Sequence, residues 1–256
     1  NLVTFYVCYE IMTLTSLPLV LHEMTKEAVM AGLKYLFYSV AGAFLALFGI
    51  FYLYGAAGSL TFTPGGVSMG LSINGHEGLF LGAVCCMLVG FGTKAGMFPL
   101  HGWLPTAHPV APAPASALLS GILTKTGVFG ILMVTVTMFR HDRVWGMVLL
   151  APGAVTMVLG AILAVFSIDL KRTLACSSMS QIGFIIIAIG MQGLLGEHNA
   201  LAASGTLLHF LNHSLFKLLL FLGAGVIFMN LRELNLNKIR GYGKDKPLLK
   251  LIFLMP

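Results

Sequence analysis

The residues with the most obvious chemistry in this sequence are ionisable side chains that interrupt long apolar stretches. Glu10, Lys94, Lys125 and Lys217 each fall near the middle of such a stretch. If the stretches span a membrane, each charge near the bilayer centre costs about 2.5–3.5 kcal/mol on insertion scales, which indicates a function. Desolvation favours the neutral form of a lysine, so a buried amine can both load and release a proton. This pattern points to movement of protons, or of a cation exchanged for them.

A second set of candidate residues lies on one face of a single predicted helix. His209, His213 and Lys217 recur every fourth residue, with Asn212 beside them. The unperturbed pKa of histidine, about 6.5, suits a proton relay. Two alternatives stay open for the histidines: metal ligation at positions i and i+4, or a core role with each ring bonded to a backbone carbonyl. For the lysines the alternative is a set of buried ion pairs, although Glu10 is the one acid available to them.

The composition excludes a soluble fold. Hydrophobic residues make up 57% of the 256 residues and charged residues 9%, against roughly 25% charged residues in an ordinary soluble domain. Apolar runs of about 20 residues predict helices, because backbone groups in lipid must find partners within their own segment. We expect an all-α polytopic transmembrane helical bundle, a single domain over residues 1–256. The expected spans are Asn1–Leu21, Val29–Tyr54, Leu79–Pro99, Pro114–Phe139, Val144–Phe166, Thr173–Met191 and Asn199–Met229, with a partial eighth from Pro247.

The third predicted span is irregular. Gly90, Gly92, Gly96 and Pro99 interrupt it, and a proline-rich link to Pro114 follows. This pattern is typical of a broken transmembrane helix that lines a cavity. A rigid surface loop is the alternative interpretation of the prolines.

The distribution of basic residues predicts the orientation. One set of loops holds Lys26, Lys171 and Arg172 and then Arg232, Lys238, Arg240, Lys244 and Lys246, whereas the other set holds Arg140 and Arg143. The positive-inside rule places the first set in the cytoplasm and the loop 54–79 outside. Lys34 and Lys250 lie close enough to a cytoplasmic end to reach the headgroups. The localisation expected is an integral membrane protein of a prokaryotic cytoplasmic membrane.

The sequence offers no ligand set for a cofactor. Cys8, Cys85, Cys86 and Cys176 form no C-x-x-C pair and are expected to pack in apolar surroundings. No Walker motif exists, and nucleotide, quinone and nucleic-acid binding gain no support. The chain opens within one apolar segment and stops within another, so we expect an internal fragment of a longer subunit.

Four segments together resemble a known family. They are YEIMTLTSLPLV from Tyr9, GTKAGMFPLHGWLPTAHPVAPAPASALLSGILTKTGVFG from Gly92, DLKRTLACSSMSQIGF from Asp169 and HFLNHSLFKLLLFLGAG from His209. In this order they resemble the antiporter-like membrane subunits of respiratory complex I, membrane-bound hydrogenases and multi-subunit Na⁺/H⁺ antiporters. The resemblance covers nearly the whole chain. Cys176 and Gln181 depart from it, because relatives often have Tyr and His at these positions.

The resemblance implies a role for each candidate residue. Glu10 would be the acid that modulates Lys94, and Lys94 the first proton carrier on the broken helix. Lys125 would be the central lysine of the next helix. His209, His213 and Lys217 would form the connecting polar axis. A second broken helix with the outer proton-carrying group would follow this chain, and about four spans of the family would precede it.

Three functions are compatible with these features of the sequence. The leading hypothesis is a proton-translocating subunit of a redox-driven complex, of the complex I or hydrogenase type, whose partner subunits carry out the redox chemistry. The second is a subunit of a monovalent cation/proton antiporter, which would move protons and Na⁺. The third is a structural membrane anchor whose charges only fix helix packing. The partners expected are other membrane and redox subunits and the lipid bilayer.

Overall fold

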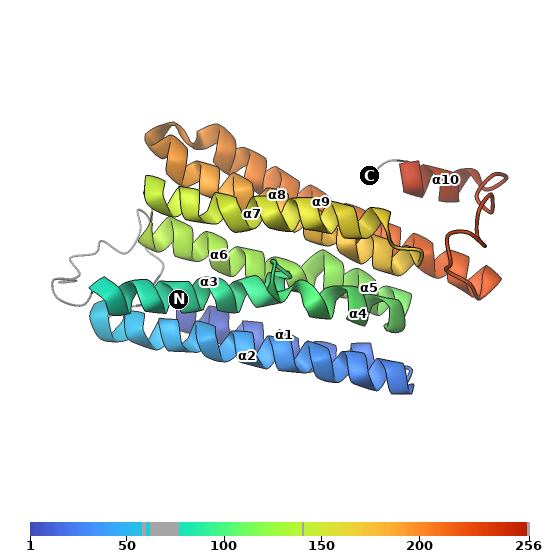
Figure 1. The fold of residues 1–256 in the computed structure, drawn as a ribbon, viewed down its shortest axis with the longest axis horizontal. Helices are drawn as coiled ribbons and strands as arrows, with labels where there is room; N and C mark the ends of the chain where they lie inside the picture. The colour runs from blue at the N-terminus through green and yellow to red at the C-terminus, as the bar shows by residue number, and fades with distance from the viewer. Residues whose placement is uncertain (58–59, 62–76, 140, 255–256) are drawn as a thin grey trace.

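The computed structural model describes residues 1–57, 60–61, 77–139 and 141–254. Within them nearly all residues are helical, and the long helices lie side by side in one bundle (Figure 1). The α-helices are α1 (Leu2–Leu21), α2 (Lys26–Ala57), α3 (Glu77–Ala95), α4 (Leu104–Val110), α5 (Ala113–Leu118), α6 (Thr124–Met138), α7 (Arg143–Val165), α8 (Leu170–Leu195), α9 (Ala200–Leu231) and α10 (Pro247–Leu254). The described residues contain 7 helical segments long and apolar enough to cross a membrane. The all-α polytopic class is therefore confirmed.

The predicted spans coincide with these helices. The third span extends through its irregular part, so that the candidate span covers Gly78–Val110. The predicted partial eighth run is α10, which packs against α9 apart from the other helices (Figure 1). Most of the predicted loop 54–79 and Arg140 lie outside the described residues. Cys176 is buried as expected, whereas Cys8 and Cys85 are exposed on the surface of the bundle.

The third span is broken where the sequence predicts. Helix α3 ends at Ala95, and Gly96 adopts a φ of 80°. A side chain there would be strained, and its Cβ would lie 2.8 Å from the Leu104 Cδ1 atom. The chain then resumes as a 3₁₀ turn, Leu100–Trp103, and as α4. The proline-rich link is helical at α4 and its His108 is fully buried, so the alternative of a surface loop is wrong.

The fourth span contains an irregularity that the sequence analysis did not predict. Residues Leu119–Leu123 form a π-helical turn between α5 and α6. The two helices and this turn make one span, Ala113–Met138. A π turn frees backbone groups and is frequent at functional sites. Lys125 follows it directly.

Helices α7 and α8 pack closely through small residues. A Cβ atom added at Gly183 would lie 2.4 Å from the backbone nitrogen of Met157, and one added at Gly160 would lie 2.4 Å from that of Ser180. Small residues allow such close contact between transmembrane helices. This face of α8 is therefore a backbone-to-backbone contact.

The predicted cytoplasmic loops meet at one end of the bundle. The Leu170 amide donates to the Leu234 carbonyl at 3.0 Å, and the Leu236 amide to the Ile168 carbonyl at 2.8 Å. These bonds join the start of α8 to the segment that follows α9. Glu23, after α1, and Arg232, after α9, line the same cavity. The grouping of these loops is confirmed, and their assignment to the cytoplasm stays a prediction.

Candidate functional site

Lys94 lies in a cage of aromatic and hydroxyl groups at the break of the third span. It belongs to the last turn of α3 and is fully buried. Its Nζ atom donates to Thr13 Oγ1 on α1, and lies 4.8 Å from the ring centroid of Tyr9 and 5.9 Å from that of Tyr35. Ring faces attract cations, so the cage stabilises an ammonium group without a carboxylate in contact.

Glu10 follows Tyr9 on α1, on the same helix as Thr13. Its Oε1 atom is buried and has no hydrogen-bond partner among the described residues. Within the same residues, one ion pair is found, Lys238 with Glu233, so Glu10 and Lys94 interact electrostatically without direct contact. The alternative that the buried lysines serve in ion pairs is therefore wrong in the part of the chain that the structure describes.

Lys125 is buried beside the π turn. Its Nζ atom donates to the Ser120 carbonyl at 2.7 Å. The Ser120 hydroxyl lies 2.7 Å from the Ser178 hydroxyl on α8, which in turn donates to the Leu174 carbonyl at 3.0 Å. Either hydroxyl can be the donor in the bond between Ser120 and Ser178. Hydrogen bonds thus lead from Ser120, the residue that binds Lys125, across to α8.

Lys217 reaches the same point from another helix. It is buried on α9, and its Nζ atom donates to the Leu174 carbonyl at 3.0 Å and to Ser177 Oγ. The Leu174 carbonyl therefore accepts bonds from Ser178 and from Lys217. Two buried lysines on α6 and α9 are linked across one face of α8 by serines and a shared carbonyl.

The predicted histidine row lies along α9 as a partly buried face. The ring centroids of His209 and His213 are 6.1 Å apart, with an angle of 10° between the ring planes. His213 is buried, and neither of its ring nitrogens has a hydrogen-bond partner among the described residues. The alternative of histidines bonded to backbone carbonyls therefore does not hold for His213. Asn212 is exposed, and the described residues contain no group of three potential metal ligands.

The structure adds two residues that the sequence analysis missed. Lys171, counted there as a loop charge, is 5% exposed and donates to the Ala111 carbonyl at 2.8 Å. The Asp169 side chain caps the start of α8 by accepting from the Arg172 amide, which places Lys171 in the first turn of that helix. Asp169, a preferred N-cap residue directly before the run that begins at Leu170, was a signal for a helix start. The cytoplasmic-loop assignment of Lys171 is corrected accordingly.

The second missed residue is His108, on α4. It is fully buried, both ring nitrogens lack hydrogen-bond partners among the described residues, and its ring stacks on Phe221 at 4.8 Å. It lies within electrostatic reach of Lys125, Lys171 and Lys217. Its role was hidden in the sequence because the surrounding proline-rich segment also fits a surface loop.

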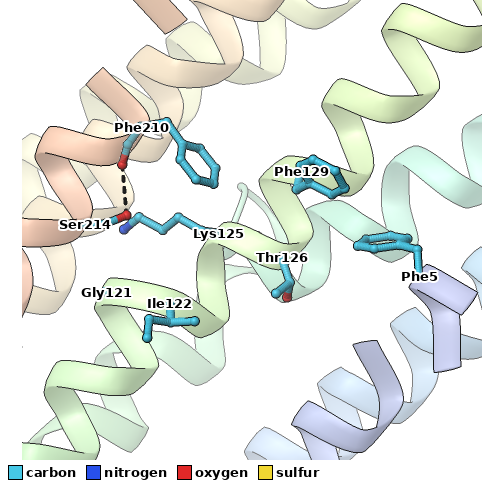
Figure 2. A pocket seen from close by; sticks show the side chains of 8 residues that line it. All are labelled: Phe5, Gly121, Ile122, Lys125, Thr126, Phe129, Phe210 and Ser214. Atoms are coloured by element: carbon cyan, nitrogen blue, oxygen red, sulfur yellow. Dashed lines mark hydrogen bonds between the residues drawn. The ribbon is translucent and has the colours of Figure 1, made fainter. Parts of the chain in front are cut away.

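Two cavities adjoin these residues. One of about 300 Å³ is lined by Phe5, Lys125, Phe210 and Ser214. Figure 2 shows the Lys125 side chain extended from α6 toward Ser214 on α9. The other, of about 730 Å³, lies at the end of the bundle where the basic loops meet, and Lys171 is among its lining residues. Lys171 thus lies between an opening at that end and the buried groups.

The fold and the site define a polytopic α-helical membrane protein with ionisable groups buried along a broken helix and its neighbours. The whole chain, residues 1–256, matches the family described as NADH:quinone oxidoreductase/Mrp antiporter, transmembrane region, and belongs to that family. The resemblance stated from the sequence is confirmed.

Relatives in this family come from several kinds of complex. The chain is 39% identical over 255 residues to hydrogenase-4 component B of Escherichia coli, and the match covers 96% of this chain and 37% of the relative. It is 30% identical over 255 residues to a subunit of the Na(+)/H(+) antiporter of Alkalihalophilus pseudofirmus, and that match covers 99% of this chain and 50% of the relative. The chain therefore spans half or less of the length of these relatives.

Two solved structures share the fold. A chain of the membrane-bound sulfane sulfur reductase, an archaeal respiratory membrane complex, superposes with a TM-score of 0.80 at 25% identity, over 96% of this chain and 49% of that chain. A chain of the Mrp complex from Dietzia sp. superposes with a TM-score of 0.81 at 24% identity, over 97% of this chain and 45% of that chain. The second likeness concerns the fold alone.

Proposed function

We propose that this chain forms the proton-translocating part of a membrane subunit in a redox-driven complex, of the complex I or membrane-bound hydrogenase type. The observation that carries the proposal is that two buried lysines flank the serine face of α8: Lys217 binds the Leu174 carbonyl directly, and Lys125 binds the carbonyl of Ser120, whose hydroxyl contacts Ser178. Partner subunits carry out the redox chemistry, and the complex resides in a prokaryotic cytoplasmic membrane. The bacterial hydrogenase relative supports this choice.

The geometry suggests how a proton moves. At an effective dielectric of about 20, two unit charges interact by roughly 4 kcal/mol at 4 Å and about half as much at 8 Å. A proton that reaches one buried lysine therefore repels a proton on the next and drives it onward. The Ser120 and Ser178 hydroxyls lie between the two lysines and can each donate and accept, whereas the Ser120 and Leu174 carbonyls hold the two amines in place.

The ends of this pathway follow from the surrounding residues. Lys171 takes up protons from the 730 Å³ cavity, and His108 carries them toward Lys217 and Lys125. Lys94 binds a proton within its aromatic cage, and the nearby Glu10 carboxylate sets the balance between the charged and neutral forms of the lysine. His209 and His213 extend the row along α9.

The second candidate is a subunit of a monovalent cation/proton antiporter. The relative from the Na(+)/H(+) antiporter, whose match covers 99% of this chain, favours it. The two functions differ in their energy source. A sodium-dependent pH change in vesicles that lack any electron donor would support the antiporter, whereas proton movement that requires electron transfer supports the redox-driven complex.

The proposal is tested on the intact complex in proteoliposomes. Lys94→Met and Lys125→Met remove the buried amines, and we expect each assembled variant to move markedly fewer protons per electron transferred. Lys26→Met is the matched control, because Lys26 is exposed at the start of α2. Full proton yield in both buried variants would overturn the proposal and favour the structural anchor.

A further inference from the structure

A cavity outside the proton pathway lies where α9, the segment 232–246 and α10 meet. Its volume is about 530 Å³, within the range of small-molecule sites. Leu170, Ile227 and Leu249 line it and are buried, and Phe253 of α10 lines it as well. Figure 1 shows α10 (red) next to the C-terminal part of α9, and both helices contribute lining residues to the cavity. The interior of the cavity is therefore mainly apolar.

Two lysines give this apolar cavity a cationic border. Lys244 and Lys250 are among its lining residues, and both are exposed. Neither takes part in an ion pair in the described part of the chain. Other cations nearby are engaged: Lys238 binds the Glu233 carboxylate at 2.6 Å, and Lys246 lies 3.8 Å from the ring centroid of Tyr242.

The surrounding charge is also positive. Residues 232–250 contain six basic residues, Arg232, Lys238, Arg240, Lys244, Lys246 and Lys250, and two acidic residues, Glu233 and Asp245. The hydrogen bond from Lys238 holds the pKa of Glu233 below its usual value, so this carboxylate stays ionised and bound to Lys238. Asp245 is the one acid without an ion pair in this stretch of described residues. An anion at the cavity meets a net positive field.

We infer that this cavity binds an anionic phospholipid. Its phosphate lies between Lys244 and Lys250, and an acyl chain packs against Leu170, Ile227 and Phe253. The position fits, because α9 ends at Leu231 and α10 begins at Pro247, so the cavity lies at the level where helices leave the bilayer. Basic pockets between transmembrane helices on the cytoplasmic side attract anionic headgroups. A free phosphate would leave the apolar lining unused.

The test measures lipid contact directly, in the full-length protein reconstituted in lipid nanodiscs. Phe253→Trp places a fluorophore in the cavity, and brominated acyl chains quench it on contact. Phosphatidylglycerol and phosphatidylcholine with the same brominated chains are compared, and the quenching of protein without this substitution is subtracted. An anionic surface contributes about 1 kcal/mol per lysine, or about fivefold, so we expect roughly thirtyfold preference for phosphatidylglycerol.

Variants of the border separate this site from general charge attraction. The double change Lys244→Gln/Lys250→Gln should reduce the preference to near one, and Lys244→Arg/Lys250→Arg should keep it. Lys238→Gln is the matched control in the same segment and should leave it unchanged. Unaltered Trp emission in phosphatidylcholine verifies that the cavity persists.

Several outcomes would overturn the inference. Equal quenching by the two lipids would mean that the cavity does not select for charge. If Lys238→Gln lowered the preference for phosphatidylglycerol as much as the double variant does, the preference would come from the overall surface charge. Displacement of the lipid by inorganic phosphate would assign the lysines to a free anion. No quenching by either lipid would mean that a protein segment fills the cavity. None of these results bears on proton translocation.

Discussion

The two faces of α8 make contacts of opposite character. Toward α7, Gly183 and its neighbours bring backbone against backbone. Toward α6 and α9, the Leu174 carbonyl accepts from Lys217, and Ser178 contacts Ser120, the residue whose carbonyl binds Lys125. One helix thus serves as a rigid support on one side and as a polar surface on the other.

This difference indicates which side of α8 can rearrange. The glycine face has no room for a methyl group, so it holds α8 at a fixed distance from α7. The lysine side chains on the other face have several rotatable bonds and bind groups that also bind each other. We therefore expect changes on the first face to alter stability and changes on the second to alter transport.

The largest expected effect is on the polar face. Lys217→Met removes the amine that binds the Leu174 carbonyl and Ser177. We expect proton yield per electron to fall to about a tenth or less, as for loss of a group that transfers protons. Proton uptake by proteoliposomes holding the assembled complex measures it. Lys246→Met, at an exposed lysine, should leave the yield unchanged, and an equal loss there would contradict the assignment.

The next effect is on the glycine face. Gly183→Ala introduces a Cβ atom 2.4 Å from the Met157 nitrogen, so the two helices must separate. We expect the free energy of unfolding in detergent to fall by about 1–3 kcal/mol, as for overpacking of a core. Gly205→Ala is the matched control, because a Cβ atom there meets nothing within 4 Å. Alanine favours helix, so that control should be neutral or stabilising. An unchanged free energy of unfolding in Gly183→Ala would contradict the contrast drawn between the two faces of α8.

A smaller effect is expected from the hydroxyls between the lysines. Ser178→Ala removes the hydrogen-bond partner of the Ser120 hydroxyl and leaves both lysine amines in place. We expect the turnover-linked proton rate to fall severalfold, with the free energy of unfolding nearly unchanged. Ser204→Ala on α9 is the control, because that exposed hydroxyl bonds only within its own helix. If Ser178→Ala reduced stability and left the rate intact, the serine face would be structural.

The smallest effect is expected outside both faces, at Glu233. Its pKa lies below the usual value, first because of the hydrogen bond from Lys238. The stabilisation that this pair adds is present above the unfolded pKa and is lost as the pH falls through the lowered folded pKa. Lys238→Gln should raise the pKa of Glu233, as followed by NMR of ¹³C-labelled glutamate. The free energy of unfolding should not change measurably, because surface ion pairs contribute little.

Much of the fold could be predicted from the sequence because lipid restricts the choices. Apolar runs of sufficient length must form helices, and the glycines before Pro99 marked the break. The π turn could not be predicted, because Ser120 and Gly121, although weak helix formers, do not specify a π turn over an α-helical one.

The candidate site was predictable only in part. A lysine in the middle of an apolar run, such as Lys94, stands out because a charge costs free energy inside a bilayer. Lys171 lies at the edge of a run and was therefore assigned to a loop. Ser120 and Ser178 carry no such signal. Their pairing joins residues 58 positions apart and becomes visible only when α8 packs beside the π turn.

The most direct test of proton transfer by the buried lysines replaces Lys125 with arginine. Arginine keeps the positive charge and the hydrogen-bond donors but cannot release a proton in a protein. In the assembled complex, we predict that Lys125→Arg lowers the proton yield per electron as far as Lys125→Met does. Full yield in Lys125→Arg together with loss in Lys125→Met would show that the charge, and not the proton, is what the site requires.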